Sequence, residues 1–161
     1  QIMHQEQFAR GKGHFHYFDW KESTELRTNG EQFPFILTTG RILEHYNCGT
    51  MTRRTGNVQI LTEDVLLIHP EDAVRHFIED GDMVCVSSQR GKVDVKAKIT
   101  DEVKPGILST TFHFPEILLN IITSDVHDSE AMCPEYKVVA VNIRKSKGKF
   151  KQLAATENLN H

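Results

Sequence analysis

Short apolar runs separated by turn residues constrain the fold of this chain more than any other feature. Apolar and charged residues alternate from Val93 to Ile99, a pattern typical of a strand with one buried face. Five further runs are expected to form strands, at residues 33–37, 65–68, 83–86, 107–112 and 136–143. A short helix is expected at 69–78, with Pro70 in its first turn. This pattern predicts a mainly β fold with short helices, a closed or nearly closed barrel of six strands.

Composition excludes several functional classes. The net charge of −3 and the pI near 6.3 argue against nucleic-acid binding by bulk electrostatics. No run of about 18 apolar residues exists, so no membrane span is expected. The three cysteines, Cys48, Cys85 and Cys133, form no Cys-x-x-Cys motif, which favours a reducing compartment and a cytoplasmic location. The chain starts on Gln1, which is consistent with a piece of a longer polypeptide.

The segment from Thr38 to Arg54 is rich in groups that bind anions. It follows an apolar run, and Gly40 allows the backbone to approach a ligand closely. Its cations and hydrogen-bonding side chains are Arg41, His45, Thr50, Thr52, Arg53 and Arg54. We expect a ligand that carries phosphate or a polar heterocycle.

Simpler interpretations exist for parts of this segment. Taken alone, residues 38–41 also fit a strand end followed by a turn. Arg53 and Arg54 fit a solvated pair or a contact with another domain equally well, and they are not included in the predicted site. His45 and Cys48 lack an orienting third group, so they do not indicate a nucleophile and its base.

Five separated motifs occur in order along the chain. They are FPFILTTGR at 33–41, HY at 45–46, GTMTRR at 49–54, FHF at 112–114 with Asn120, and PEYK at 134–137. Together they resemble the C-terminal molybdopterin-dinucleotide-binding domain of the molybdenum or tungsten formate dehydrogenase catalytic (alpha) subunit, in the dimethyl-sulfoxide-reductase family. The resemblance covers residues 33–143, about two thirds of the chain, and RGKGHF at 10–15 is similar to the segment that precedes this domain.

The resemblance implies a double-psi β-barrel that caps a bis(molybdopterin guanine dinucleotide) cofactor carrying molybdenum or tungsten. The implied contacts are Gly40, Arg41, His45, Tyr46, Asn47, Phe112, His113, Asn120, Tyr136 and Lys137. Pyrophosphate suits Arg41 and Lys137, whereas a pterin suits an amide and aromatic walls. No catalytic residue or metal ligand is expected in this chain, because the family places its metal-ligating and iron–sulfur cysteines far upstream. Asn47 and Cys48 stand where His-Thr is commoner.

The resemblance also predicts the organisation of the chain. Residues 1–32 would be an arm and linker from the preceding domain, 33–143 the barrel, and 144–161 a flexible basic tail. The leading hypothesis is the capping domain of a formate dehydrogenase that oxidises formate to carbon dioxide, inactive on its own. Its partners would be the remaining domains and electron-transfer subunits, and iron–sulfur clusters would lie only in the parent protein.

Two alternatives remain at this point. One is the same domain from another molybdopterin oxidoreductase, such as a nitrate reductase. The other is a stand-alone double-psi barrel that acts as an interaction or substrate-recognition module. The cofactor hypothesis expects Arg41, His45, Asn120 and Lys137 to converge on one ligand, and the stand-alone hypothesis does not require it.

Overall fold

The computed structural model describes residues 11–13, 15, 17–130 and 132–147, and in this part six strands close into a barrel. The strands are β1 (Phe35–Thr39), β2 (Val65–Ile68), β3 (Met83–Ser87), β4 (Lys92–Ile99), β5 (Ile107–Thr110) and β6 (Val139–Lys145). Their order around the barrel is β1-β5-β2-β4-β3-β6. The predicted six-stranded closed barrel is therefore confirmed.

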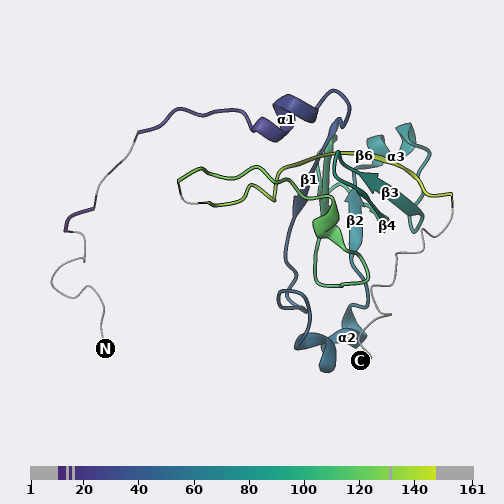
Figure 1. The fold of residues 1–161 in the computed structure, drawn as a ribbon. Coiled ribbons are helices and arrows are strands. Elements are labelled where there is room, and N and C mark those ends of the chain that lie inside the picture. Colours follow the sequence, from purple (N-terminus) through teal and green to yellow (C-terminus); the bar gives the residue numbers. More distant parts are fainter. Residues whose placement is uncertain (1–10, 14, 16, 131, 148–161) are drawn as a thin grey trace, which may run out of the picture.

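Consecutive strands rarely lie side by side in this barrel. β1 pairs with β5 and β2 pairs with β4 in parallel, and the other neighbours are antiparallel. Parallel neighbours need crossover connections. The two long connections are residues 40–64 and 111–138, and Figure 1 shows them leaving the barrel as extended loops, the first reaching down to α2.

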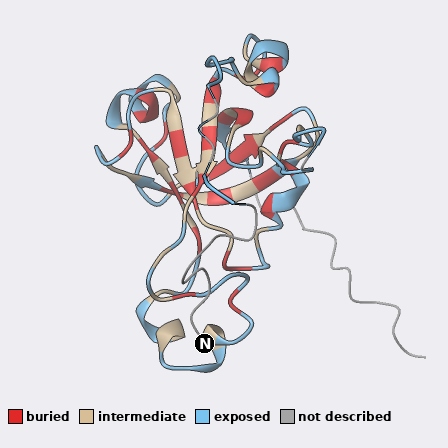
Figure 2. Ribbon diagram, turned by 90° about the vertical axis from the view of Figure 1, so that its left-hand side faces the viewer, coloured by how far each residue is buried: buried red, intermediate tan, exposed pale blue. Residues whose placement is uncertain are grey.

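The core lies inside the barrel. Leu37, Leu66, Leu108, Val95 and Val139 come from five different strands and are fully buried. Figure 2 shows buried positions alternating with more exposed ones along the strands. Each such side chain contributes about 1.5–3 kcal/mol relative to leaving it in water. Strand periodicity therefore explains how the barrel is filled.

The helices are short. They are α1 (Thr24–Asn29), the 3₁₀ turn η1 (Thr52–Arg54), α2 (Asn57–Ile60), α3 (Pro70–Arg75) and the 3₁₀ turn η2 (Leu119–Ile121). α3 begins as predicted, with Pro70 in the first turn and the His69 ring accepting a hydrogen bond from the Glu71 amide at 3.2 Å. It ends earlier than predicted, because Phe77 has a φ of 55°, which a helix does not allow.

Several boundaries differ from the predicted ones. β1 begins two residues later than expected, β5 stops at Thr110, and β6 begins at Val139. Tyr136 and Lys137 consequently lie in a turn, because the ladder between β1 and β6 ends where Leu37 pairs with Val139. β6 continues to Lys145, two residues into the predicted tail. Residues 1–10 and 148–161, with His14 and His16, lie outside the described residues.

Helix α1 falls inside the segment predicted to be an arm and linker. Its Glu25 side chain is buried, and its carboxylate forms an ion pair with Arg90, between β3 and β4. α1 therefore contacts the barrel directly. The described residues before α1 form no helix or strand.

A buried carboxylate just before β2 holds the second connection. Asp64 accepts hydrogen bonds from the Phe114 amide at 3.0 Å, from the His113 amide at 3.4 Å and from the Thr111 hydroxyl. Three residues of the stretch 111–114 are thereby tied to one side chain. Asp64 thus positions the polypeptide that follows β5.

Replacing Asp64 with asparagine should lower the free energy of unfolding by about 2 kcal/mol, because one oxygen becomes an NH₂ group facing a donor. Urea denaturation followed by circular dichroism measures this change. The matched control is Asp101→Asn at an exposed position, expected to stay within about 0.5 kcal/mol of the wild type. Equal stability of the Asp64 variant and the wild type would contradict the anchoring role.

Candidate functional site

A cleft lies beside the shared end of β1 and β5. Its volume is about 580 Å³, and it is lined by Thr39, Arg41, Phe112, Leu119, Asn120, Thr123, Ser124, Pro134 and Tyr136. The parallel register pairs Thr39 with Thr110, so both strands end at the same edge. The residues that follow them, Arg41 and Phe112, meet there as a result.

Arg41 and Phe112 form the charged side of the cleft. The guanidinium carbon of Arg41 lies 5.7 Å from the centroid of the Phe112 ring, a cation–π distance. Within the described part of the chain, no carboxylate forms an ion pair with Arg41. Its charge is therefore available to an anion that enters the cleft.

Thr39 contributes a hydroxyl group that sequence reasoning missed. The residue is buried, and its Oγ1 has no hydrogen-bond partner among the described residues. A buried polar atom without a partner costs about 1–3 kcal/mol, so most are satisfied in folded proteins. The sequence signal was a polar residue at an inward position of an apolar strand, directly before Gly40.

Four of the ten predicted site residues line this one cleft: Arg41, Phe112, Asn120 and Tyr136. Gly40 lies between Thr39 and Arg41, and its amide donates to the Thr110 carbonyl at 2.9 Å. A Cβ added at Gly40 would meet open space, so no part of the described chain presses on it. These residues form a continuous surface with cationic, aromatic and amide groups.

His45 lies elsewhere, as an internal brace of the first connection. Its ring is buried, with Nε2 2.9 Å from the Leu61 carbonyl and Nδ1 2.9 Å from the Thr52 hydroxyl. A carbonyl only accepts, so Nε2 carries a proton. The His45 ring therefore ties residues 45, 52 and 61 of this connection together.

His113 braces the two connections against each other. Its side chain is fully buried, Nδ1 donates to the Asn47 carbonyl, and Nε2 accepts from the Ile42 amide at 3.4 Å. These partners define the tautomer, with the proton on Nδ1. The ring thus has no nitrogen left for a ligand in this arrangement.

The remaining predicted residues do not line the cleft. Tyr46 and Lys137 are exposed, and Asn47 is exposed with a φ of 49°. The expectation that Arg41, His45, Asn120 and Lys137 form one surface is therefore met by Arg41 and Asn120 only. His45 does not line the cleft because its ring is held by polar partners within the first connection, residues 40–64.

Two further hollows contain no predicted site residue. One, of about 400 Å³, lies against β4 and is lined by residues of both charges, including the ion pair between Lys96 and Glu63 at 2.7 Å. The other, of about 430 Å³, lies between residues 21–24 and 126–135. The described residues contain no group of three or more side chains that could hold a metal ion, and no helix suited to crossing a membrane.

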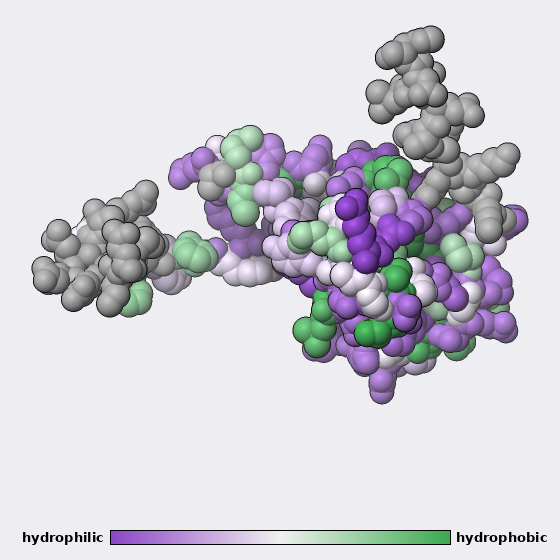
Figure 3. All heavy atoms as spheres, turned by 90° about the horizontal axis from the view of Figure 1, so that it is seen from below, coloured by the Kyte–Doolittle hydropathy of each residue, from purple (hydrophilic) through white to green (hydrophobic). Residues whose placement is uncertain are grey.

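The first connection also exposes apolar side chains. Leu43, Tyr46, Met51 and Ile60 are more than half exposed. Figure 3 views the molecule from the side to which this connection projects, and hydrophobic side chains are interspersed there among hydrophilic ones. The exposed apolar surface on this connection is therefore scattered and does not add to the cleft.

The chain is similar in sequence to known oxidoreductases. Over 148 residues the chain is 41% identical to the F420-dependent formate dehydrogenase subunit alpha of Methanocaldococcus jannaschii, which covers 90% of this chain and 22% of that protein. It is 32% identical over 116 residues to the periplasmic nitrate reductase of Desulfovibrio desulfuricans, covering 71% of this chain and 15% of that protein. The chain thus spans about a fifth of the length of the first relative and less of the second.

A solved structure shares the fold. The acetylene hydratase from Pelobacter acetylenicus superposes with a TM-score of 0.59 at 15% identity, covering 73% of this chain and 19% of that one. At the level of sequence families, residues 35–140 match the molydopterin dinucleotide binding domain. With relatives about 40% identical over most of its length, this chain belongs to the molydopterin dinucleotide binding domain family, as found in formate dehydrogenase alpha subunits.

Proposed function

We propose that the cleft binds one pterin dinucleotide of a bis(molybdopterin guanine dinucleotide) cofactor and that the barrel caps it. The observation that carries this proposal is the convergence of Arg41, Phe112, Asn120 and Tyr136 on one cleft. A stand-alone interaction module does not require these four residues to meet.

The chemistry of the cleft fits such a ligand. Arg41 supplies a cation for a pyrophosphate. Phe112 and Tyr136 supply aromatic surfaces for a planar heterocycle, and the Asn120 amide both donates and accepts. The Thr39 hydroxyl, which has no partner among the described residues, supplies a further polar group at the end of β1. The cleft volume of about 580 Å³ suits part of a dinucleotide.

The other predicted residues take different roles in this proposal. Gly40 leaves open space beside Arg41 for the ligand. Tyr46, Asn47 and Lys137 would contact the dinucleotide only at its margin. His45 and His113 hold the connections that carry the contacts, since their ring nitrogens are occupied by the protein.

At the level of the parent protein, we propose a cytoplasmic formate dehydrogenase that oxidises formate to carbon dioxide. When bound, the molybdenum or tungsten cofactor would supply the two-electron chemistry, and the parent protein would hold the iron–sulfur clusters that carry the electrons. This chain would orient the pterin and exclude water from it. By itself it would be inactive.

Replacing Arg41 with glutamine should weaken binding of GDP, a probe for the guanosine pyrophosphate portion, about tenfold. Titration calorimetry on this chain measures the affinity. Arg27→Gln is the matched control, because it removes the same charge from an exposed position on α1. Equal affinity of the Arg41 variant and the wild type would argue against a phosphate contact.

Replacing Phe112 with leucine should weaken binding of 6-hydroxymethylpterin about three- to tenfold, because stacking and the cation–π partner of Arg41 are both lost. Quenching of pterin fluorescence reports the affinity. Phe18→Leu, at an exposed position, should leave it unchanged. If both variants bind the pterin equally, Phe112 is not a wall of its site.

The substrate is tested on the full-length parent enzyme. Formate should drive reduction of a viologen dye, and metal analysis should detect molybdenum or tungsten. Relatives named as nitrate reductases make nitrate the second candidate. Oxidation of reduced viologen by nitrate, without reduction by formate, would replace formate with nitrate in the proposal.

A further inference from the structure

One wall of the cleft is built from residues that belong to no strand of the barrel. Leu119 and Asn120 lie in η2, and Thr123 and Ser124 follow it. A 3₁₀ turn of three residues has too few internal hydrogen bonds to hold its own position. The placement of this wall must therefore come from contacts with other elements.

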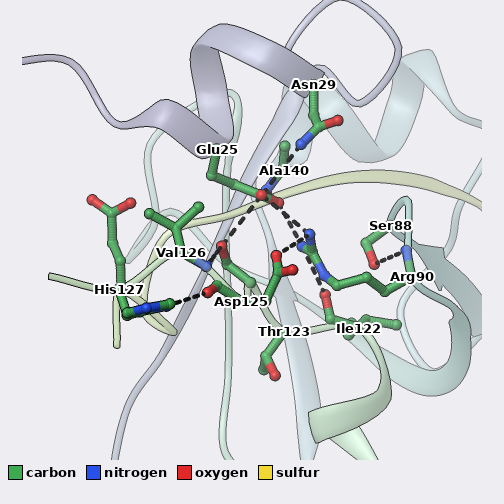
Figure 4. A network of polar contacts seen from close by, with 12 residues as sticks. Glu25, Asn29, Ser88, Arg90, Ile122, Thr123, Asp125, Val126, His127 and Ala140 are labelled. Carbon is green, nitrogen blue, oxygen red and sulfur yellow. Dashed lines mark hydrogen bonds and ion pairs between the residues drawn. The ribbon is translucent and has the colours of Figure 1, made fainter. Parts of the chain in front are cut away.

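The Glu25 carboxylate of α1 makes several of these contacts at once. Figure 4 shows it facing the Arg90 guanidinium, whose two terminal nitrogens lie 2.6 and 3.2 Å from its two oxygens. The same carboxylate accepts from the Ser124 hydroxyl at 3.3 Å and from the Ala140 amide at 3.2 Å. One buried side chain thus joins α1, the turn before β4, the cleft wall and β6.

Arg90 extends the contact to the end of η2. Its Nη2 donates to the Ile122 carbonyl at 3.4 Å, and its Nη1 lies 3.6 Å from Asp125 (Figure 4). Carbonyl and hydroxyl contacts therefore hold the wall on both sides of Thr123. Because Glu25 is only 2% exposed, water cannot readily replace either partner.

A glycine lets the same turn approach the wall closely. A Cβ at Gly91 would lie 2.4 Å from Cγ2 of Ile121 and 3.1 Å from its carbonyl oxygen. The turn carrying Arg90 therefore packs directly on η2. Because Ile121 is the neighbour of Asn120, a shift of this turn would also shift Asn120.

We propose that Glu25 and Arg90 are positioning residues for the cofactor cleft, which hold η2 and Ser124 where Asn120 and Thr123 can meet the ligand. This inference rests on the proposed function of the cleft. Neither Glu25 nor Arg90 lines the cleft, so both act through the wall.

The main test uses Glu25→Gln in this chain. The variant should bind 6-hydroxymethylpterin and GDP about tenfold more weakly, because a displaced wall misplaces its polar groups. Amide hydrogen exchange should become faster at residues 119–124 and stay unchanged in β2 and β5. Val86→Ala, which truncates a fully buried core residue in β3, is the control for general destabilisation. It should retain wild-type affinity for both probes.

Two milder variants cover the case in which Glu25→Gln fails to fold. Arg90→Lys retains the charge but cannot donate to both Glu25 oxygens and to Ile122, so it should give a smaller loss of affinity. Gly91→Ala leaves the ion pair intact and displaces Ile121, and it should also weaken binding. In a Glu25→Gln background, Arg90→Lys should add little further loss.

The outcomes separate the two proposals. Wild-type affinity and unchanged exchange at 119–124 in these variants would overturn the positioning role. Equal loss of affinity in Val86→Ala would overturn it as well, since any destabilisation would then suffice. If the wild-type chain binds neither probe, the proposed function of the cleft fails, and with it the positioning role that depends on it.

Discussion

The parallel pairing of β1 with β5 determines where the cleft lies. Parallel strands end at the same edge of a sheet. Because Thr39 pairs with Thr110, the connections that begin at residues 40 and 111 start from adjacent points. Residues 71 positions apart, Arg41 and Phe112, become neighbours for this reason. An antiparallel pair in the same place would have put them at opposite ends of the barrel.

Buried polar side chains then shape the connections that leave this edge. Asp64 holds the residues after β5, His113 joins the two connections, and His45 closes the first one on itself. Each of these groups has partners, as burial in a low-dielectric interior requires. Thr39 is the contrast, because its hydroxyl lacks a partner in the described residues and lies where the proposed ligand would bind.

The strands could be predicted from the sequence because their signal is local. Alternation over β4 and the apolar run of β2 depend only on neighbouring residues, and both elements were predicted to within one residue. The start of β6 could not be predicted from the sequence, because it depends on where the ladder with β1 ends. The position of His45 was missed for a similar reason, since the Leu61 carbonyl that it contacts is 16 residues away and carries no sequence signal. Helix α1 was missed because the burial of Glu25 depends on Arg90, 65 residues along the chain.

The contact between α1 and the barrel affects how this unit can be transplanted. The family match begins at residue 35, after α1 has ended, so a domain excised at that border would lose Glu25. The partly buried Arg90 guanidinium would then lose its buried partner and, among the described residues, keep only the exposed Asp125 carboxylate, at 3.6 Å, and removing one partner of a buried ion pair is destabilising. A graft, fusion or recombination event that carries the barrel into a new polypeptide must therefore bring helix α1 along with it.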